Sequence, residues 1–138
     1  MRELDRADLI LHAGDFVAAE VFDALRELAP VDGVHGNQDD PELRLLLPAR
    51  CVVDVAGHRI GIVHDPGPQR GREARLAARF PDCELVVYGH THIPELTRHG
   101  TLTLLNPGSP TERRRGPYHA MGIVTVGESG LDTNICSL

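Results

Sequence analysis

The sequence predicts an α/β fold in which two mixed β-sheets pack together and are flanked by helices. Two observations support this prediction. In the first half of the chain, short apolar runs alternate with segments of helical periodicity, as in βα units with parallel strands. In the second half, apolar runs are joined by short glycine-containing turns, which predict antiparallel hairpins. The length of 138 residues is that of one domain, expected here over residues 1–138.

In the first half, each predicted strand is followed by a helix. Apolar side chains recur at every third or fourth position from Val17 to Leu28, which is the period of one helix face, and Pro30 ends that helix. Asp40-Pro41-Glu42 is typical of a helix start, with an acidic N-cap and a proline in the first turn. The predicted elements are a strand over residues 7–13, a helix over 16–28, a strand over 31–35 and a helix from residue 40.

In the second half, Gly57, Gly100 and Gly130 mark the turns of three predicted hairpins. The Pro- and Gly-rich segment 65–71 is predicted to be a loop, and its residues 66–71 are predicted to form the rim of a site. The predicted elements are a hairpin of strands 51–55 and 59–63, a helix over 72–80, a strand over 84–88, a hairpin of 96–98 and 101–105, and a hairpin of 121–126 and 131–136.

Composition narrows the classes of function. The formal net charge of −6 argues against a nucleic-acid backbone as a partner. No signal peptide or apolar stretch long enough to span a bilayer is visible, so no membrane partner is expected. Cys51, Cys83 and Cys136 form no CxxC pair, which indicates a reducing compartment, and we expect a cytoplasmic protein. The sequence leaves the oligomeric state open, a homo-oligomer included.

The chain contains no lysine, since all 14 basic residues are arginine. This excludes a P-loop lysine that reaches nucleotide phosphates and a lysine that forms a Schiff base.

Four of the apolar runs end on side chains that bind metals. The four motifs are Gly14-Asp15, Gly36-Asn37-Gln38-Asp39, His64-Asp65 and Gly89-His90-Thr91-His92. In open α/β sheets, ligands bind at the carboxyl ends of the strands, and a glycine there is expected to let the backbone turn sharply and approach an ion. A carboxylate, an amide oxygen and imidazoles form a mixed oxygen and nitrogen set that suits Mn²⁺, Fe²⁺, Zn²⁺ or Ni²⁺.

The spacing of His90 and His92 places both imidazoles on the same side of an extended segment. They would serve one ion, or two ions about 3.5–4 Å apart, as in two-metal phosphoesterases, and Asp15 has two oxygens with which to bridge such a pair. Simpler interpretations remain for single residues. Asp15 would also suit a helix N-cap and Asn37 a turn, and Asp39 is expected to support the turn in preference to binding metal.

In this order, the four motifs resemble those of the calcineurin-like metallophosphoesterases. Together with Asn106-Pro107-Gly108-Ser109, they resemble the small YfcE-like phosphodiesterase subfamily, over about residues 7–126. The resemblance implies two stacked mixed sheets flanked by helices (α/β/β/α). It implies a metal site in which Asp15 bridges two ions, Asn37, His64 and His90 complete one shell, and His92 binds the other ion. Mn²⁺ is the first choice of metal. The implied activity is hydrolysis of a small phosphodiester by a metal-activated hydroxide.

The chain departs from the family pattern at three places, of which the least consequential is Asp65, where the family often has a glycine. The family opens with a strand that ends in Asp-x-His, and nothing before Asp15 matches it. The chain is therefore interpreted as N-terminally truncated relative to the family, without the first strand and helix. A start assigned too far downstream is the simplest explanation. On this interpretation, the chain binds one metal better than two and is a weak catalyst.

The second departure is Gln38, at a position where related phosphodiesterases have a histidine that protonates the leaving group. A glutamine amide has no titrating proton, so substrates with good leaving groups are expected. The alternative interpretation is a non-catalytic metal-binding or protein-interaction scaffold on the same fold, as in the retromer subunit that resembles these enzymes. The remaining histidines match no motif and are predicted to be structural or surface residues: His12, His35, His58, His99 and His119.

Overall fold

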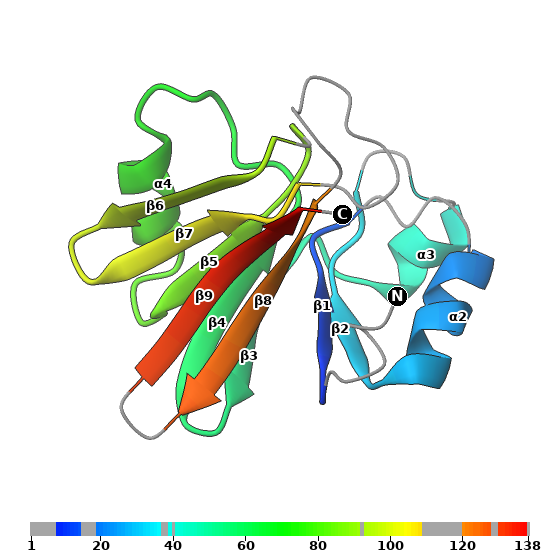
Figure 1. Cartoon of the computed structure of the whole chain (residues 1–138). Helices are drawn as coiled ribbons and strands as arrows, with labels where there is room; N and C mark the ends of the chain where they lie inside the picture. Colours follow the sequence, from blue (N-terminus) through cyan, green and yellow to red (C-terminus); the bar gives the residue numbers. More distant parts are fainter. Residues whose placement is uncertain are drawn as a thin grey trace.

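The structure is a computed structural model that describes residues 8–14, 19–36, 39, 41–91, 93–108, 120–127 and 130–137. Within them, strands outnumber helices, and the chain passes from βα units to hairpins as predicted (Figure 1). The elements are β1 (Ile10–His12), α2 (Ala19–Leu28), β2 (Val31–Gly33), α3 (Pro41–Leu46), β3 (Arg50–Val55), β4 (His58–Val63), α4 (Arg72–Arg79), β5 (Leu85–Tyr88), β6 (Glu95–His99), β7 (Leu102–Asn106), β8 (Ala120–Gly127) and β9 (Gly130–Ser137).

A mixed five-stranded sheet forms the centre, in the order β3-β4-β5-β7-β6. The strands β4, β5 and β7 run parallel to one another, and the outer strands β3 and β6 pair with them antiparallel. All four residues of β5 are buried, as an apolar run covered on both faces requires. Because β4, β5 and β7 point the same way, their carboxyl ends meet at one edge of the sheet.

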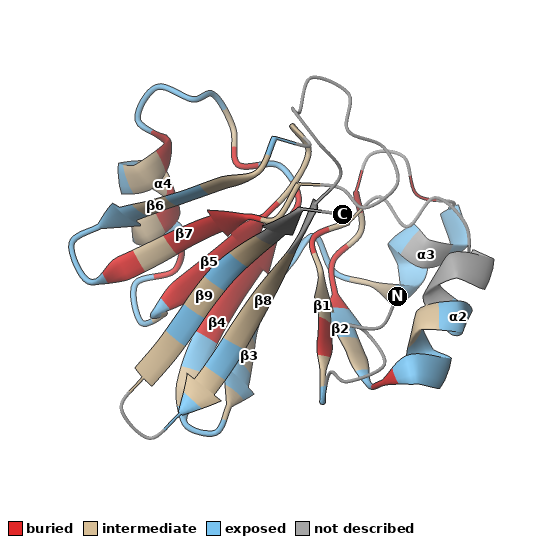
Figure 2. Ribbon diagram, in the orientation of Figure 1, coloured by how far each residue is buried: buried red, intermediate tan, exposed pale blue. Residues whose placement is uncertain are grey.

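Apolar side chains cover both faces of this sheet, and its strands β5 and β7 are largely buried (Figure 2). On one face, the cluster around Ile62 and Leu105 packs against Val124 of β8 and Ile135 of β9. On the other face, Leu76 of α4 and its neighbour Phe80 pack against buried side chains of β4, β5 and β7. Because successive side chains of a strand point to opposite faces of the sheet, the core has two parts, one on each face.

A second layer of strands, beside the five-stranded sheet, contains the antiparallel pair β8–β9 and the parallel pair β1–β2. Figure 1 shows β8 and β9 drawn in front of the central sheet, with β1 and β2 beside them and α2 on the outer side of β2. The predicted α/β fold of packed sheets with outer helices is confirmed. Among the described residues, the second layer consists of two separate two-stranded sheets. No helix in the part of the chain that the structure describes is both long and apolar enough to cross a membrane.

Candidate metal centre

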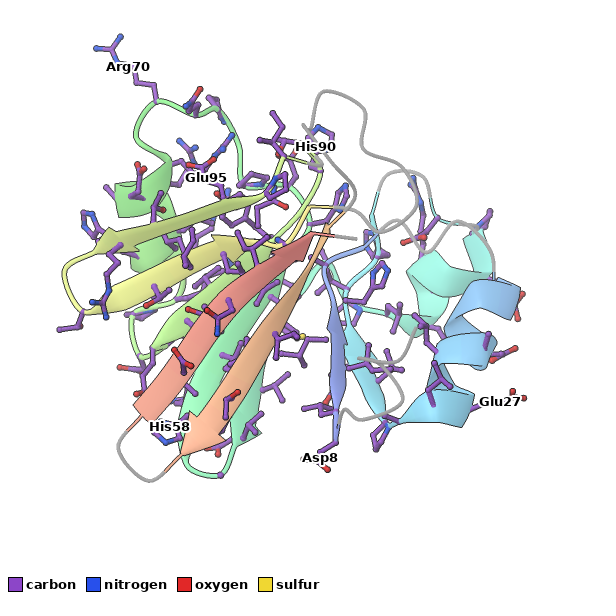
Figure 3. The ribbon with its side chains drawn as sticks, in the orientation of Figure 1. Asp8, Glu27, His58, Arg70, His90 and Glu95 are labelled. Carbon is purple, nitrogen blue, oxygen red and sulfur yellow. The ribbon has the colours of Figure 1, made fainter. Side chains whose placement is uncertain are left out.

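The candidate site lies where β4 and β5 end. The last matched pair of these parallel strands is Val63 with Tyr88, so the residues that follow, His64 and Gly89, also lie side by side. The backbone N–H of Gly89 donates to the carbonyl of His64 at 3.0 Å. This bond extends the ladder by one step and brings His90 next to His64. Figure 3 shows His90 at this edge of the sheet.

The ring of His64 is buried and has a defined orientation. It is 5% exposed, and its Nδ1 lies 2.7 Å from the backbone carbonyl oxygen of Ala13. A carbonyl only accepts, so Nδ1 carries the proton, and the lone pair of the neutral ring is on Nε2, which faces Nδ1 of His90. A backbone acceptor behind one ring nitrogen is the usual way in which proteins orient a metal-binding histidine.

The Nε2 atom of His64 lies 3.3 Å from Nδ1 of His90, and the two rings stand at 85° to each other. Two nitrogens that each lie about 2.0–2.1 Å from one ion, at a tetrahedral angle, are about 3.3–3.4 Å apart. The separation of the two imidazoles therefore fits their binding to one common ion.

The backbone at His90 is in a conformation that residues other than glycine rarely adopt. Its φ is 72°, and the N–H of Thr91 donates to the carbonyl of Gly89 at 2.9 Å, which makes a tight three-residue turn centred on His90. Such a turn is strained and persists where the surroundings hold it. The expectation that glycines supply the sharp turns is wrong here, because Gly89 is not in the left-handed region and His90 is.

The side chain of Asn106, at the end of β7, holds this turn in place. It is fully buried, and its Nδ2 donates to Thr91 Oγ1 at 2.9 Å and to Gly89 O at 3.4 Å. Its Oδ1 accepts from the N–H of Gly108 at 3.0 Å. A buried amide with every group satisfied stabilises one arrangement of its neighbours. Sequence reasoning named Asn106 as part of a motif but did not identify this supporting role.

The chain near Gly14 and Gly36 closes the site from the other side. Gly14 has φ of 96°, and a Cβ built on it would lie 2.7 Å from His64 Nδ1 and 2.8 Å from Gly36 N. Gly14 thus makes the turn that was expected of it, and it also allows three segments to meet. The buried carboxylate of Asp39 accepts from Gly36 N at 2.7 Å, which agrees with the predicted turn-supporting role.

Of the five predicted ligands, the structure describes two, and it brings these two together. His64 and His90 are adjacent, whereas Asp15, Asn37 and His92 lie outside the described residues. Across the described part of the chain, no group of three or more His, Cys, Asp or Glu side chains is placed to hold a metal. The pair of imidazoles is therefore the part of the predicted site whose geometry is established.

A pocket of about 320 Å³ adjoins the two imidazoles. Its lining residues are His35, Gly36, Arg44, Ala49, Val63, His64, Asp65 and His90. Sequence reasoning did not foresee the place of His35, which was expected to be structural or on the surface, nor that of Arg44. The sequence signal for a place of His35 at the site was its position directly before the predicted ligand motif that begins at Gly36.

Two other histidines have the structural roles expected of them. His12 Nδ1 accepts from the N–H of Gly14 at 3.1 Å. His58 lies 2.7 Å from Glu84 Oε2 and 3.2 Å from the carbonyl of Gly127, so it connects two hairpins to the start of β5. His119 lies outside the described residues.

The loop after His64 is held by two arginines of α4. The guanidinium of Arg75 donates to the carbonyls of Pro66, Pro68 and Arg70. Arg72 donates to Gly67 O at 3.0 Å and lies over the ring of Tyr88 at 5.5 Å. Asp65 lines the pocket, whereas residues 66–71, which were predicted to form the rim of a site, are not among its lining residues. The sequence contains arginines at positions 72 and 75, but it does not show which backbone carbonyls they bind.

Comparisons with known sequences find relatives over most of the chain. A family model described as the calcineurin-like phosphoesterase superfamily domain matches residues 1–129. A probable metallophosphoesterase of Methanocaldococcus jannaschii is 36% identical over 115 residues, which cover 81% of this chain and 58% of the relative. A probable metallophosphoesterase of Methanothermobacter thermautotrophicus is 33% identical over 130 residues, covering 93% of this chain and 74% of the relative.

Solved structures share the same fold. A Thermotoga maritima protein matches with a TM-score of 0.75 at 28% identity, covering 99% of this chain and 84% of that one. Entamoeba histolytica Vps29 in complex with zinc matches at 0.77 and 23% identity, with 99% and 86% covered. An archaeal phosphodiesterase matches at 0.73 and 20% identity, with 94% and 84% covered. The last two likenesses concern the fold alone.

Proposed function

Because the chain belongs to the calcineurin-like phosphoesterase superfamily, we propose that it is a metal-dependent phosphodiesterase that acts on small phosphodiesters. One observation carries the proposal. His64 and His90, at the carboxyl ends of parallel strands, present two nitrogens 3.3 Å apart, and Ala13 O orients the first ring from behind. This is a prepared pair of ligands, and two parallel strands that merely pack together have no need of one.

The metal would be held by Asp15, Asn37, His64, His90 and His92. This donor set of oxygen and nitrogen suits Mn²⁺ first, with Ni²⁺, Fe²⁺ and Zn²⁺ as alternatives. When bound, such an ion supplies a hydroxide nucleophile at neutral pH and neutralises charge on the phosphoryl oxygens. The chain's own part is to fix the ligands: the Ala13 carbonyl keeps the proton of His64 on Nδ1 and so leaves Nε2 available as a ligand.

Two features of the chain support small phosphodiesters with good leaving groups as substrates. The pocket beside the imidazoles, at about 320 Å³, is at the small end of ligand pockets. The net charge of −6 disfavours a long polyanionic strand. Gln38 has no titrating proton for the departing alkoxide, so the leaving group has to be stable as an anion. An archaeal phosphodiesterase among the structural neighbours is consistent with this class of reaction.

The proposal predicts Mn²⁺-dependent hydrolysis of bis(p-nitrophenyl) phosphate. Removing one ligand with His90→Ala should reduce kcat/KM at least about 100-fold. Substituting a residue that only supports a metal ligand already lowers metal affinity or activity about 10–100-fold, and loss of the ligand itself should cost more. The matched control is His99→Ala, which removes an exposed histidine on β6 that does not line the pocket. Activity that survives both His90→Ala and Asp15→Asn would contradict the metal mechanism.

A non-catalytic scaffold is the second candidate. It is favoured by Gln38 and by the likeness of the fold to Vps29, whose solved structures include a zinc complex. On this proposal, the metal organises the loops and no phosphodiester is hydrolysed. Tight Mn²⁺ binding that is lost in His90→Ala, with no hydrolysis of any activated phosphodiester at any Mn²⁺ concentration, would favour the scaffold over the enzyme.

A further inference from the structure

The strand β3 forms one edge of the central sheet, and among the described residues no strand lies on its outer side. Its residue Asp54 lies opposite Arg59 of β4. The carbonyl of Arg59 accepts from Glu84 N at 2.9 Å, so the backbone of Arg59 bonds toward β5 and away from β3. Because a residue of an antiparallel pair directs its N–H and carbonyl to the same side, those of Asp54 point to the outer side.

The outward positions of β3 carry a symmetric pattern of side chains. Bonded and non-bonded pairs alternate along an antiparallel ladder, so Arg50 and Val52 also direct their backbone groups outward. The side chains of these three outward residues are exposed, that of Val52 by 46%. Those between them, Cys51 and Val53, pack against the apolar core on the other face. The outer edge therefore presents a positive, an apolar and a negative side chain at equal spacing.

Neither charge of this edge belongs to an ion pair in the part of the chain that the structure describes. Arg50 makes no ion pair there, and Asp54 Oδ1 accepts from Gly57 N at 3.0 Å, which leaves the carboxylate further acceptor positions. Arg59, opposite Asp54, lies 3.8 Å from Asp82. Charges on an edge strand usually keep other strands away. Opposite charges placed symmetrically about an apolar residue instead match those of an identical strand.

The matching follows from the register of two antiparallel copies of β3 about a two-fold axis at Val52. Arg50 of each copy then lies directly opposite the partner's Asp54, and the two Val52 side chains face each other. All three facing pairs consist of residues with outward backbone groups, so each is a hydrogen-bonded pair. Cross-strand pairs of opposite charge stabilise a sheet, and two-fold symmetry makes the charge pair occur twice.

The other edge of the central sheet, β6, lacks this self-complementarity. The N–H of Thr103 donates to Glu84 O, so Arg98, which lies opposite Thr103, has its backbone groups on the outer side of β6. A two-fold axis at the exposed Leu96 would place Arg98 opposite the partner's Pro94, which has neither a charge nor an N–H. Two copies would therefore join through β3 and not through β6.

We propose that β3 is the interface of a symmetric homodimer, in which the central sheets of two copies join edge to edge into one continuous sheet. The partner is a second copy of this chain, because the edge is complementary to itself in backbone groups, apolar contact and charge. The inference is independent of the proposed function, since neither the metal nor the pocket takes part in it.

Sedimentation equilibrium of the full chain tests the proposal. We expect the mass to rise with concentration from that of one chain to that of two. Arg50→Asp and Asp54→Arg each place like charges opposite one another at two symmetric points, so each should raise the Kd of the dimer at least about tenfold. An equimolar mixture of these two variants should form a heterodimer with a Kd near that of the wild type, because every facing pair again has opposite charges.

Two further variants complete the test. Arg98→Asp makes the same charge change as Arg50→Asp on the other edge of the sheet and should keep the wild-type Kd. Val52→Lys places two lysines opposite each other at the two-fold axis and should also raise the Kd at least about tenfold. It leaves the hydrogen bond between Asp54 and Gly57 intact, so it decides the question even where Asp54→Arg does not fold, as circular dichroism would show.

Three results would overturn the proposal. The first is a wild-type chain that stays monomeric at all concentrations up to about 1 mM, where even weak association is detected. The second is a Kd that does not change in Arg50→Asp or in Val52→Lys. The third is a mixture of the two folded charge variants that does not associate more tightly than either variant alone.

Discussion

The ring of His64 is held from behind by the carbonyl of Ala13, and the ring of His90 is aimed at it from a strained turn. At the scale of single residues, these two orientations decide what the site is able to do. Neither ring is placed by its own strand alone. His64 depends on a carbonyl 51 positions away in the chain, and the turn at His90 depends on the Asn106 side chain at the end of β7.

The substitution Gly14→Ala tests how closely the segments around His64 must approach. The new Cβ would lie 2.7 Å from His64 Nδ1 and 2.8 Å from Gly36 N, at a φ of 96° that side chains rarely adopt. We expect it to displace the hydrogen bond between Ala13 and His64 and to lower the Mn²⁺ affinity about 10–100-fold, as loss of a supporting bond does. Calorimetric titration with Mn²⁺ measures this loss.

Gly57→Ala is the control for the backbone strain in Gly14→Ala. Gly57 has a similar φ of 85°, and nothing lies within 4 Å of a Cβ built there. It should lower the free energy of unfolding by a comparable amount while leaving the Mn²⁺ affinity unchanged. If both variants lost metal affinity equally, the close approach at Gly14 would have no special role.

At the scale of elements, α4 acts as a clamp on the loop that follows His64. Arg75 donates to three carbonyls of that loop, and Gly67 lies so close that a Cβ there would be 2.9 Å from the Arg75 guanidinium. The helix thereby fixes the path of the chain directly after a metal ligand. A proline- and glycine-rich segment would otherwise have many conformations available to it.

Arg75→Gln should release this loop without unfolding the molecule. Trypsin cleaves after arginine, and the exposed Arg70 lies in the loop, so cleavage after Arg70 should become about tenfold faster, which corresponds to about 1.4 kcal/mol of lost local stability. Cleavage rates followed by mass spectrometry give the answer. Arg79→Gln, an exposed position in the last turn of the same helix, should cleave at the wild-type rate. Equal rates in Arg75→Gln and wild type would argue against the clamp.

The packing of α4 on β5 also predicts how stability depends on alkaline pH. Burial, reinforced by Glu95 and opposed by Arg72, raises the pKa of the Tyr88 phenol to about 12. A raised pKa means that the folded state favours the neutral phenol. This contribution to stability is fully present below the ordinary tyrosine pKa of about 10 and is lost as the pH rises from about 10 to about 12.

Denaturant unfolding of the wild type and of Tyr88→Phe between pH 8 and pH 12 tests this prediction. The chain has no lysine, so few other groups titrate in this range. Burial raises the pKa of the Cys51 and Cys83 thiols as well, but they are present in both proteins. The free energy of unfolding should fall more steeply with pH in the wild type than in Tyr88→Phe. If the two curves had the same slope, the pKa of Tyr88 would not differ between the folded and unfolded states.

At the scale of the whole molecule, the sequence predicted the order and type of the elements well. Glycine turns and apolar runs located the hairpins β3–β4, β6–β7 and β8–β9 to within one or two residues, because turn chemistry and alternation act locally. The strand predicted over residues 31–35 ends at Gly33, since the N–H of His35 bonds to Pro48 O and not to a strand partner. A contact of this kind, between segments far apart in the chain, has no local signal.

The site was predicted in part for the same reason. Motif spacing identified the superfamily, which the family match confirms, and the apolar runs placed His64 and His90 each at the end of a strand; that these two strands are neighbours came from the structure. It did not show that His35 and Arg44 line the pocket, or that Arg75 and Asn106 hold the loops around it. Those roles depend on which segments meet across the molecule, and a single sequence specifies this only through the fold.

We propose that His64 and His90 bind one common metal ion. Anomalous diffraction from crystals of the Mn²⁺-loaded chain tests it most directly. We expect a strong anomalous peak within bonding distance of both His64 Nε2 and His90 Nδ1, with Nδ1 of His64 still bonded to the Ala13 carbonyl. A peak that contacts only one of these two rings, or no peak at this edge of the sheet, would contradict it.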